Sequence, residues 1–213
     1  MPTDYETDPR RIERESFRLI RELTGLDGFD RVQQQVAMRV VHSLGQPEIV
    51  TALRFGDNAC VAGLAALEGG CPILCDVEMV RAGLTRRLLK TSPLCFLNEP
   101  AVVALAAERG ESRSMAALDQ WCEHLAGSVV LIGNAPTALF RLLEMLQDGA
   151  AKPALIVAMP VGFVGAAESK QHLWDRHRDL GVECITLLGR VGGSAVTAAS
   201  VNALLRINQD EWY

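Results

Sequence analysis

Two residues that can hold an anion and move a proton lie close together in the first quarter of the chain. Arg39 and His42 are three residues apart, which places them on one face of a helix expected over residues 29–44. A histidine can exchange a proton near neutral pH, and a guanidinium beside it can bind a carboxylate. The pair could therefore hold an anionic substrate and transfer one proton to it. The alternative is an exposed histidine near a helix C-terminus, where the helix dipole favours positive charge.

Three glycine-bearing loops, each placed after a short apolar run, form a second candidate binding region. Such runs suit strands buried on both faces of a parallel sheet, and parallel strands end at a common edge. Backbone N–H groups left free at that edge, beside the N-termini of the following helices, attract anions. We therefore expect the loops to converge on one cavity, although each alone could be a tight turn that binds nothing. The loops are Gly-Asn-Ala-Pro at 133–136, Met-Pro-Val-Gly-Phe-Val-Gly at 159–165 and Gly-Arg-Val-Gly-Gly-Ser at 189–194.

Several common classes of enzyme are excluded by their motifs. The chain has no G-x-S-x-G, no G-x-x-x-x-G-K-[ST] and no G-x-G-x-x-G opening a helix, which argues against a serine hydrolase, a P-loop NTPase and a standard dinucleotide fold. Asp76 and Glu78 could form an acid/base pair or a metal site. Their place at a strand-to-helix junction favours an N-cap and a first-turn carboxylate instead. His172 and His177 are five residues apart and share a helical face poorly, so we expect no metal site there.

The composition is that of a chain able to fold as one domain over residues 1–213. Hydrophobic residues make up 49%, and the net charge of −5 comes without a basic stripe, which argues against a nucleic-acid surface. The apolar runs are far shorter than the roughly 18 residues of a membrane span, so we expect no membrane partner. Six cysteines lie in apolar runs or amphipathic helices without a C-x-x-C spacing. We expect buried free thiols in a cytoplasmic protein.

The elements that must position these residues alternate between strand and helix. This alternation predicts an α/β fold with a mainly parallel sheet, right-handed crossovers and helices on both faces. Strands are expected near 50–55, 71–75, 94–97, 129–132, 154–158 and 183–188. Helices are expected over 10–23, 29–44, 57–67, 100–107, 115–125, 136–146, 168–180 and 195–205, with Ser112 or Ser114 as the cap of the helix over 115–125.

Several longer motifs resemble those of the precorrin-8X methylmutase family, also called precorrin isomerases. The resemblance covers residues 10–206, includes the pair Ser16-Phe17, and follows the family's order. The other matching motifs are Arg-Val-Val-His (39–42), Pro-Ile-Leu-Cys-Asp-Val-Glu-Met-Val (72–80), Gly-Asn-Ala-Pro-Thr-Ala-Leu (133–139), Met-Pro-Val-Gly-Phe-Val-Gly-Ala-Ala-Glu-Ser-Lys (159–170) and Gly-Arg-Val-Gly-Gly-Ser-Ala (189–195).

The resemblance implies a flavodoxin-like three-layer sandwich, a homodimer with active sites near the subunit interface, and one step of cobalamin biosynthesis. That step moves a methyl group from C-11 to C-12 of precorrin-8X and gives hydrogenobyrinate. The histidine that resembles His42 donates a proton there, and the shift needs no redox cofactor, nucleophile or metal. Arginines, hydroxyls and helix N-termini would hold the carboxylates of the substrate. The residues expected to do so are Ser16, Arg39, Thr85, Arg113, Gly133, Asn134, Gly162, Arg190, Gly192, Gly193 and Ser194.

Two alternatives stay open beside this function. The substrate could be the cobalt-bearing macrocycle of the anaerobic route, although the motifs look closer to the metal-free branch. The chain could also be a non-catalytic tetrapyrrole carrier, against which the intact Arg39–His42 pair argues. The chain departs from the family at Glu13, where a tyrosine is expected one turn before Ser16, and over residues 95–100. Residues 174–182 look longer than usual, which suggests a surface excursion.

Overall fold

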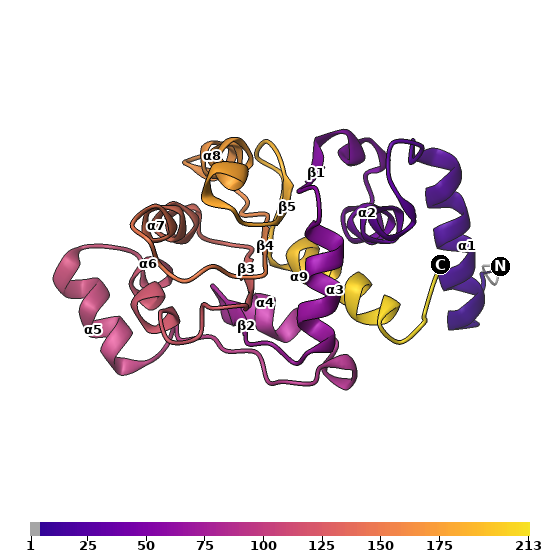
Figure 1. The fold of residues 1–213 in the computed structure, drawn as a ribbon. Helices are drawn as coiled ribbons and strands as arrows, with labels where there is room; N and C mark the ends of the chain where they lie inside the picture. Colours follow the sequence, from indigo (N-terminus) through magenta and orange to yellow (C-terminus); the bar gives the residue numbers. More distant parts are fainter. Residues whose placement is uncertain (1–4) are drawn as a thin grey trace.

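A five-stranded sheet lies at the centre of residues 5–213, the part of the chain that the computed structural model describes (Figure 1). The strand order is β1-β5-β4-β3-β2, with β2 to β5 parallel and β1 antiparallel to β5 at one edge. The predicted α/β fold with a mainly parallel sheet is confirmed. The strands span Leu53–Phe55 (β1), Ile73–Cys75 (β2), Val129–Ile132 (β3), Leu155–Ala158 (β4) and Cys184–Leu187 (β5).

The four parallel strands are buried on both faces. Every residue of β2 to β5 is buried, and successive side chains alternate between two separate apolar cores. Val129 and Leu131 belong to one core, while Val130 and Ile132 belong to the other. Continuous apolar runs form strands here because helices cover both faces of the sheet.

Helices form the two outer layers, as predicted. One core is shared by α2 (Arg31–Leu44), α3 (Ala59–Glu68), α4 (Glu78–Gly83) and α9 (Ser194–Ile207), and the other by α7 (Pro136–Gln147) and α8 (Ala166–Leu180). α1 (Pro9–Leu23) packs on α2 at one end of the molecule, and α5 (Pro100–Arg109) and α6 (Arg113–Ala116) lie at the opposite end (Figure 1). None of the helices within residues 5–213 has both the length and the apolar character needed to cross a membrane.

The ends of α2 are set by residues that the sequence places at the right spacing. The side chain of Asp30 accepts a hydrogen bond from the N–H of Gln33, and the Gln33 side chain accepts one from the N–H of Asp30, which makes a capping box. Gly45 ends the helix in the left-handed conformation, with φ of 67°. These two ends place His42 in the last turn of α2.

Three short segments differ from the predicted elements. The first half of the strand expected at 50–55 belongs to a 3₁₀ helix, η1 (Pro47–Ala52). The helix expected at 115–125 is α6 followed by a second 3₁₀ helix, η3 (Ala117–Trp121), although Ser112 caps α6 as predicted. The run at 94–97 forms only an isolated bridge between Leu94 and Leu74. Runs this short carry no period that separates a strand from a tight helical turn. A third 3₁₀ helix, η2, spans Arg86–Leu88.

The six cysteines are free, but they are not all buried. Cys60, Cys75 and Cys184 are buried as predicted, while Cys71 and Cys95 are half-buried. Cys122 is exposed, which corrects the expectation for this residue. It follows η3 directly, at a point where the segment no longer presents a regular apolar face.

The chain turns back after α9, so that its last described residues lie beside α1 (Figure 1). Asp210 takes the left-handed conformation, with φ of 58°, and the N–H of Glu211 donates to the carbonyl of Arg206 at 2.9 Å. The indole N–H of Trp212 donates to the Asp210 carboxylate at 2.8 Å. We call residues 208–213 the return segment. It brings an aromatic residue, Tyr213, onto the face shared by α1 and α2.

Candidate active site

The side chain of His42 lies exposed at the end of α2 and stacks on an aromatic ring from α1. Phe17 is buried between the two helices and lies parallel to the imidazole, with ring centres 5.1 Å apart and an angle of 4° between the planes. Aromatic stacking of this kind fixes the orientation of the imidazole. Its exposure leaves the imidazole accessible to a ligand.

The surroundings of His42 favour the neutral imidazole in the free protein. Partial burial and the guanidinium of Arg39 lower the pKa of His42 below its ordinary value, and the carboxylate of Glu13 opposes them. The imidazole therefore holds its proton weakly until further negative charge arrives. A ligand carboxylate bound at Arg39 offsets the guanidinium and raises the pKa of His42.

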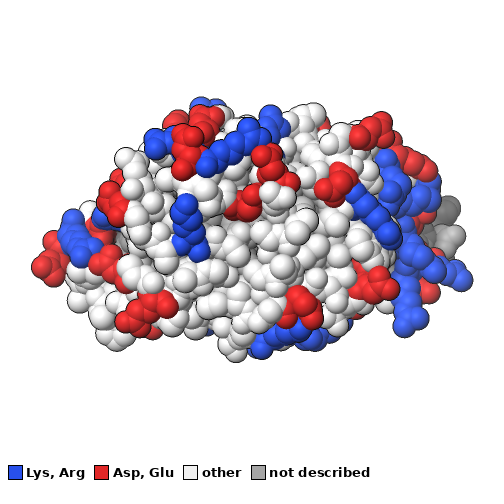
Figure 2. All heavy atoms as spheres, in the orientation of Figure 1, with Lys and Arg blue, Asp and Glu red and all other residues white. Residues whose placement is uncertain are grey.

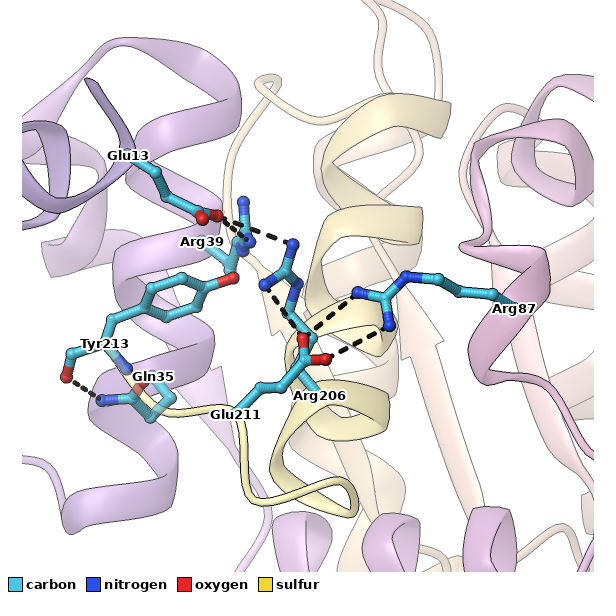
Figure 3. A network of polar contacts seen from close by, with 7 residues as sticks. All are labelled: Glu13, Gln35, Arg39, Arg87, Arg206, Glu211 and Tyr213. Atoms are coloured by element: carbon cyan, nitrogen blue, oxygen red, sulfur yellow. Dashed lines mark hydrogen bonds and ion pairs between the residues drawn. The ribbon is translucent and has the colours of Figure 1, made fainter. Parts of the chain in front are cut away.

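Two carboxylates hold three arginines, one of them Arg39, in a single cluster, as Figure 3 shows. Oε1 of Glu13 lies 3.0 Å from Nη2 of Arg39 and 3.6 Å from Nη2 of Arg206. The carboxylate of Glu211 lies 3.1 Å from Arg206 and 3.2 Å from Arg87. Burial and the charge of Arg206 lower the pKa of Arg39 to about 10, so Arg39 stays charged at neutral pH. Its buried Nε has no hydrogen-bond partner among residues 5–213.

Tyr213 of the return segment adds a third ring to this cluster. Its ring stacks on Phe17, with centres 3.7 Å apart and an angle of 11° between the planes. The guanidinium carbon of Arg39 lies 4.4 Å from the ring centre of Tyr213 and 4.9 Å from that of Phe17. Guanidinium groups are attracted to aromatic faces. The result is a stack of three rings beside a guanidinium, in which the ring of Phe17 is buried by its neighbours.

Six residues of this cluster were not predicted as site residues: Glu13, Phe17, Arg87, Arg206, Glu211 and Tyr213. Phe17 belongs to the matched Ser16-Phe17 pair, and Glu13 stands out as a departure from the family, so both carried a signal in the sequence. Arg206 and Tyr213 carried none. Their approach to Arg39 depends on the turn after α9 and on the packing of α9 against α2, which no local spacing predicts.

The backbone N–H groups after β3 are not free, which corrects the expectation for Gly133 and Asn134. The buried carboxylate of Asp76 accepts hydrogen bonds from the N–H groups of Gly133 (3.1 Å), Asn134 (2.8 Å) and Ala135 (2.9 Å). Burial raises the pKa of Asp76, and these donors counteract the shift. Asp76 is structural, as predicted, but it anchors this loop instead of capping α4, whose N-cap is Val77. These N–H groups therefore bind a carboxyl group of the chain itself and are not available to a ligand.

The loops after β4 and β5 are bonded to each other. The N–H of Gly193 donates to the carbonyl of Met159 at 2.7 Å, and the N–H of Gly162 donates to the carbonyl of Arg190 at 3.2 Å. A Cβ atom on Gly192 would overlap the carbonyl oxygen of Met159, so the close approach of the two loops requires glycine there.

All three predicted loops meet at the carboxyl edge of the sheet. The loop after β3 joins the other two at the start of α9, where a Cβ atom on Gly133 would lie 2.8 Å from the Cα of Ser194. Asn134 and Arg190 have exposed side chains there, while Ser194 is buried. The convergence of the loops agrees with the prediction, and the cavity expected between them stays a prediction.

The end of η1 lies at this edge, on the side of the sheet that α2 covers. α2 leads through η1 to Ala52, whose carbonyl accepts the N–H of Leu188 at 2.9 Å, directly after β5. Thr85 lies beside the middle of α9, where its N–H donates to the side-chain oxygen of Asn202 at 2.8 Å. Thus one side of the sheet carries His42, Thr85 and the start of the loop after β5.

Two predicted residues, Arg113 and Ser16, lie outside the cluster of arginines and carboxylates around Arg39. Arg113 begins α6 at the opposite end of the molecule from α1 and donates to the side chain of Asn98 at 3.0 Å (Figure 1). Ser16 lines a hollow of about 610 Å³ along α1. One residue along a helix turns the side chain by about 100°, so Ser16 does not share the inward direction of Phe17.

Comparisons with known proteins give a consistent family. Residues 11–207 match the family model described as Precorrin-8X methylmutase. A Precorrin-8X methylmutase from Pseudomonas aeruginosa is 53% identical, with 94% of this chain and 97% of that protein covered. A protein of the same name from Sinorhizobium sp is 50% identical, with 95% and 97% covered. The solved structure of the precorrin-8X methyl mutase from Thermus thermophilus has a TM-score of 0.84 at 36% identity, with 94% and 97% covered.

Proposed function

The chain belongs to the precorrin-8X methylmutase family, and we propose that it catalyses the isomerisation of precorrin-8X in cobalamin biosynthesis with His42 as the proton donor. The reaction moves a methyl group from C-11 to C-12 of the macrocycle and gives hydrogenobyrinate. One observation carries the role of His42: its exposed imidazole is held against Phe17, beside the guanidinium of Arg39.

The chemistry of the rearrangement matches what this site offers. A methyl shift within one conjugated macrocycle is an intramolecular step, and protonation of the ring system draws electron density away from the migrating bond. A general acid placed against the ring contributes a factor on the order of 10²–10⁴ to the rate. The guanidinium of Arg39 can bind a carboxylate arm of the macrocycle while the exposed imidazole of His42 reaches the ring system.

Substrate binding itself charges the acid in this scheme. In the free chain, Arg39 lowers the pKa of His42. A carboxylate arm of the substrate that binds Arg39 offsets this charge, so that the imidazole takes up a proton inside the complex. The acid is then present only where the macrocycle can receive the proton.

The remaining contacts are proposed from the loops at the sheet edge. The exposed side chains of Asn134 and Arg190 can reach carboxylate arms there, and Gly162, Gly192 and Gly193 allow the loop backbones to lie close together. The N–H groups of Gly133 and Asn134 are taken by Asp76 and are left out of this set. The side chain of Thr85, beside α9, stays in the proposed set.

We infer that the enzyme is a homodimer, in which Ser16 and Arg113 serve the active site of the other subunit. Arg113 lies at the opposite end of one chain from α1, and Ser16 lines a hollow along α1 that His42 does not line. The loop after β4 exposes two large apolar side chains, Phe163 at 87% and Val164 at 89%, which supports an interface at the substrate-binding edge.

We infer that the substrate is the metal-free macrocycle. Two relatives named Precorrin-8X methylmutase, from Pseudomonas aeruginosa and Sinorhizobium sp, are 53% and 50% identical to this chain. Five relatives named Cobalt-precorrin-8 methylmutase are between 33% and 37% identical, among them the Salmonella typhimurium protein at 37%. Assays with precorrin-8X and with its cobalt form test this inference, and a higher kcat/KM for the cobalt form would reverse it.

The cysteines support a reducing compartment as the place of action. All six are free, and burial raises the pKa of Cys60 and Cys184 to about 12, which keeps both as unreactive thiols. Free thiols persist in the cytoplasm, so we infer that the protein works there.

His42→Asn tests proton donation against mere positioning. Asparagine keeps one hydrogen-bond donor and a similar size but does not titrate near neutral pH, so turnover should fall by about 100-fold or more. The rate is followed by the absorbance change from precorrin-8X to hydrogenobyrinate, and the Kd for hydrogenobyrinate should change little.

His124→Asn is the matched control, because that histidine stacks on Phe96, with ring centres 5.8 Å apart, outside the proposed site. It should turn over at the rate of the unmodified chain. Full activity of His42→Asn would reject the role of proton donor. Binding of precorrin-8X by the unmodified chain without any turnover would favour the tetrapyrrole carrier.

A further inference from the structure

The return segment (208–213) holds two arginines, Arg87 and Arg206, in the cluster that also contains Arg39. The carboxylate of Glu211 accepts hydrogen bonds from two nitrogens of Arg87, at 3.2 and 3.3 Å, and from Arg206 at 3.1 Å. These arginines, chiefly Arg87, lower the pKa of Glu211, so its carboxylate is charged at neutral pH. Figure 3 shows this carboxylate between the two guanidinium groups.

Tyr213 binds the same surface with its ring and its main chain. The ring stacks on Phe17, on the aromatic residue that also supports His42. The main-chain carbonyl of Tyr213 accepts hydrogen bonds from Arg21 (3.0 Å) and Gln35 (3.3 Å), and its N–H donates to the side-chain oxygen of Gln35 at 2.8 Å. The segment thus places a flat ring, a carboxylate and a carbonyl against an arginine-rich face.

A hollow of about 680 Å³ lies between α1 and the return segment. Four arginines line it, and Figure 2 shows Lys and Arg gathered at this end of the molecule. The hollow continues the surface on which the ring of Tyr213 lies. Its lining arginines are Arg14, Arg18, Arg21 and Arg206.

We propose that Arg21, Arg87 and Arg206 form, with Arg39 and Phe17, a binding surface for a flat polycarboxylate, which the return segment occupies in the free chain and the ligand takes over. The segment presents in miniature the groups of such a ligand, a planar ring and an acidic arm. The inference rests on the proposed function, in which the ligand is the tetrapyrrole with its many carboxylates.

The contacts of the segment suit a replaceable occupant. The side chains of Arg87 and Glu211 are 60% and 35% exposed, and exposed ion pairs stabilise a structure only weakly. The closed arrangement also leaves the hydroxyl of Tyr213 and the Nε of Arg39 buried without hydrogen-bond partners among the described residues. Unsatisfied buried polar atoms destabilise the state that contains them. A ligand with several carboxylates can pair with every one of these arginines.

Deletion of residues 210–213 tests the proposal with a probe that is not a tetrapyrrole. Benzenehexacarboxylate is flat and acidic on every side, and its Kd is measured by isothermal titration calorimetry with the intact and the shortened chain. We expect about 10-fold tighter binding by the shortened chain, because the probe no longer competes with Glu211 and Tyr213. Thermal melting checks that the shortened chain is folded. Equal or weaker binding by a folded shortened chain would overturn the proposal.

Point variants test the same competition with little change to the fold. In the full chain, Glu211→Gln should tighten probe binding by about 3-fold, because it removes the charge that holds Arg87 and Arg206. Glu108→Gln neutralises an exposed carboxylate on α5 and should change nothing. In the shortened chain, Arg87→Gln and Arg206→Gln should each weaken probe binding by about 5-fold or more. Unchanged affinity in both arginine variants would also overturn the proposal.

Hydrogenobyrinate separates this proposal from the function on which it rests. If the probe behaves as expected but neither chain binds hydrogenobyrinate, the polycarboxylate surface stands and the proposed function fails. If hydrogenobyrinate binds both chains equally well, and the probe does too, the proposed function stands and displacement of the segment is wrong. Tighter binding of both molecules by the shortened chain supports the two together.

Discussion

At the residue scale, His42 and Arg39 act as one unit, because the charge of one controls the protonation of the other. Burial and Arg39 together lower the pKa of His42 in the free chain. The folded value therefore lies below the unfolded one, so the contribution of this group to stability is lost as the pH falls from the ordinary histidine pKa of about 6.5 through the lower folded pKa. The same coupling leaves less of the imidazole protonated at neutral pH until an anion covers Arg39.

Arg39→Gln should raise the pKa of His42 in the free chain, because the substitution removes the nearest positive charge while keeping a polar side chain. The pKa is read from the pH titration of the imidazole C–H signals by NMR, assigned with His42→Asn. Arg190→Gln, which removes an exposed charge from the loop after β5, should leave the His42 titration unchanged. A pKa that stays the same or falls in Arg39→Gln would contradict the coupling.

Which residues could be predicted from the sequence depends on whether one element holds them. Arg39 and His42 share α2, so their spacing alone places them together. Asp76 could be predicted as structural from its place after a strand, but its partners follow a different strand, and only the assembled sheet brings them within reach. The stack of rings next to His42 includes Tyr213, which reaches Phe17 through a turn at Asp210. No sequence pattern predicts this turn.

At the scale of the elements, Lys170 joins α8 to the loop after β5. Its side chain is fully buried, and its Nζ donates to the carbonyl of Val191 at 2.7 Å. No carboxylate oxygen of residues 5–213 lies within 4.0 Å of this Nζ. Burial lowers the pKa of Lys170 to about 8. A buried lysine without a counter-charge is a weak point of the fold, retained here where two proposed binding loops meet α8.

Lys170→Met should remove a pH dependence of stability. The folded pKa is about 8 and the ordinary one 10.5, so the unfolded chain binds a proton first as the pH falls. As the pH falls from 10.5 to about 8, the free energy of unfolding of the unmodified chain should drop by roughly 3 kcal/mol because of this group. Urea unfolding at several pH values, compared between the two chains, isolates the effect.

Lys152→Met is the control for that comparison, because Lys152 is exposed. Its difference from the unmodified chain should stay constant over the same pH range. If the free energy of unfolding of Lys170→Met also differs from that of the unmodified chain by a constant amount, then the pKa of Lys170 is not lowered by folding.

The regular elements could be predicted better than the segments between them. The strands β3, β4 and β5 and the helices α1, α2 and α7 follow the predicted ranges closely, since long periodic segments and fully apolar runs carry strong signals. The 3₁₀ helices η1 and η3 could not be predicted, because their apolar residues serve an edge strand and a crossover whose shape the neighbouring elements decide. The meeting of the three loops at the carboxyl edge of the sheet could be predicted from the strand order. The hydrogen bonds that the loops make with each other and with Asp76 could not.

At the scale of the whole molecule, the loop after β4 exposes large apolar side chains to solvent. Phe163 and Val164 are 87% and 89% exposed, with Val161 and Val191 beside them at 47% and 37%. Contiguous exposed apolar side chains of this size mark binding surfaces. A second copy of the chain is the partner that we propose for them.

Phe163→Asp combined with Val164→Asp should convert the proposed dimer to a monomer, because two charges cannot be buried unpaired in an interface. Size-exclusion chromatography with multi-angle light scattering gives the mass of each form at micromolar concentration. Val61→Asp is the control, since Val61 is 68% exposed on α3, and it should leave the dimer intact. A fully active monomer of the unmodified chain would contradict the dimer and the shared active site.

If a ligand displaces the return segment as we propose, the arginine cluster around Glu211 also decides which molecules can bind. A small monovalent acid can replace only one of its ion pairs, and the stack on Phe17 and the bonds to Gln35 keep the return segment in place. A ligand with several acidic arms replaces them together, since each arm after the first binds at a high effective concentration. Acids with a single carboxylate would therefore not displace the segment, whereas acids with several carboxylates would. The enzyme opens to a molecule whose arms match its arginines in number and spacing.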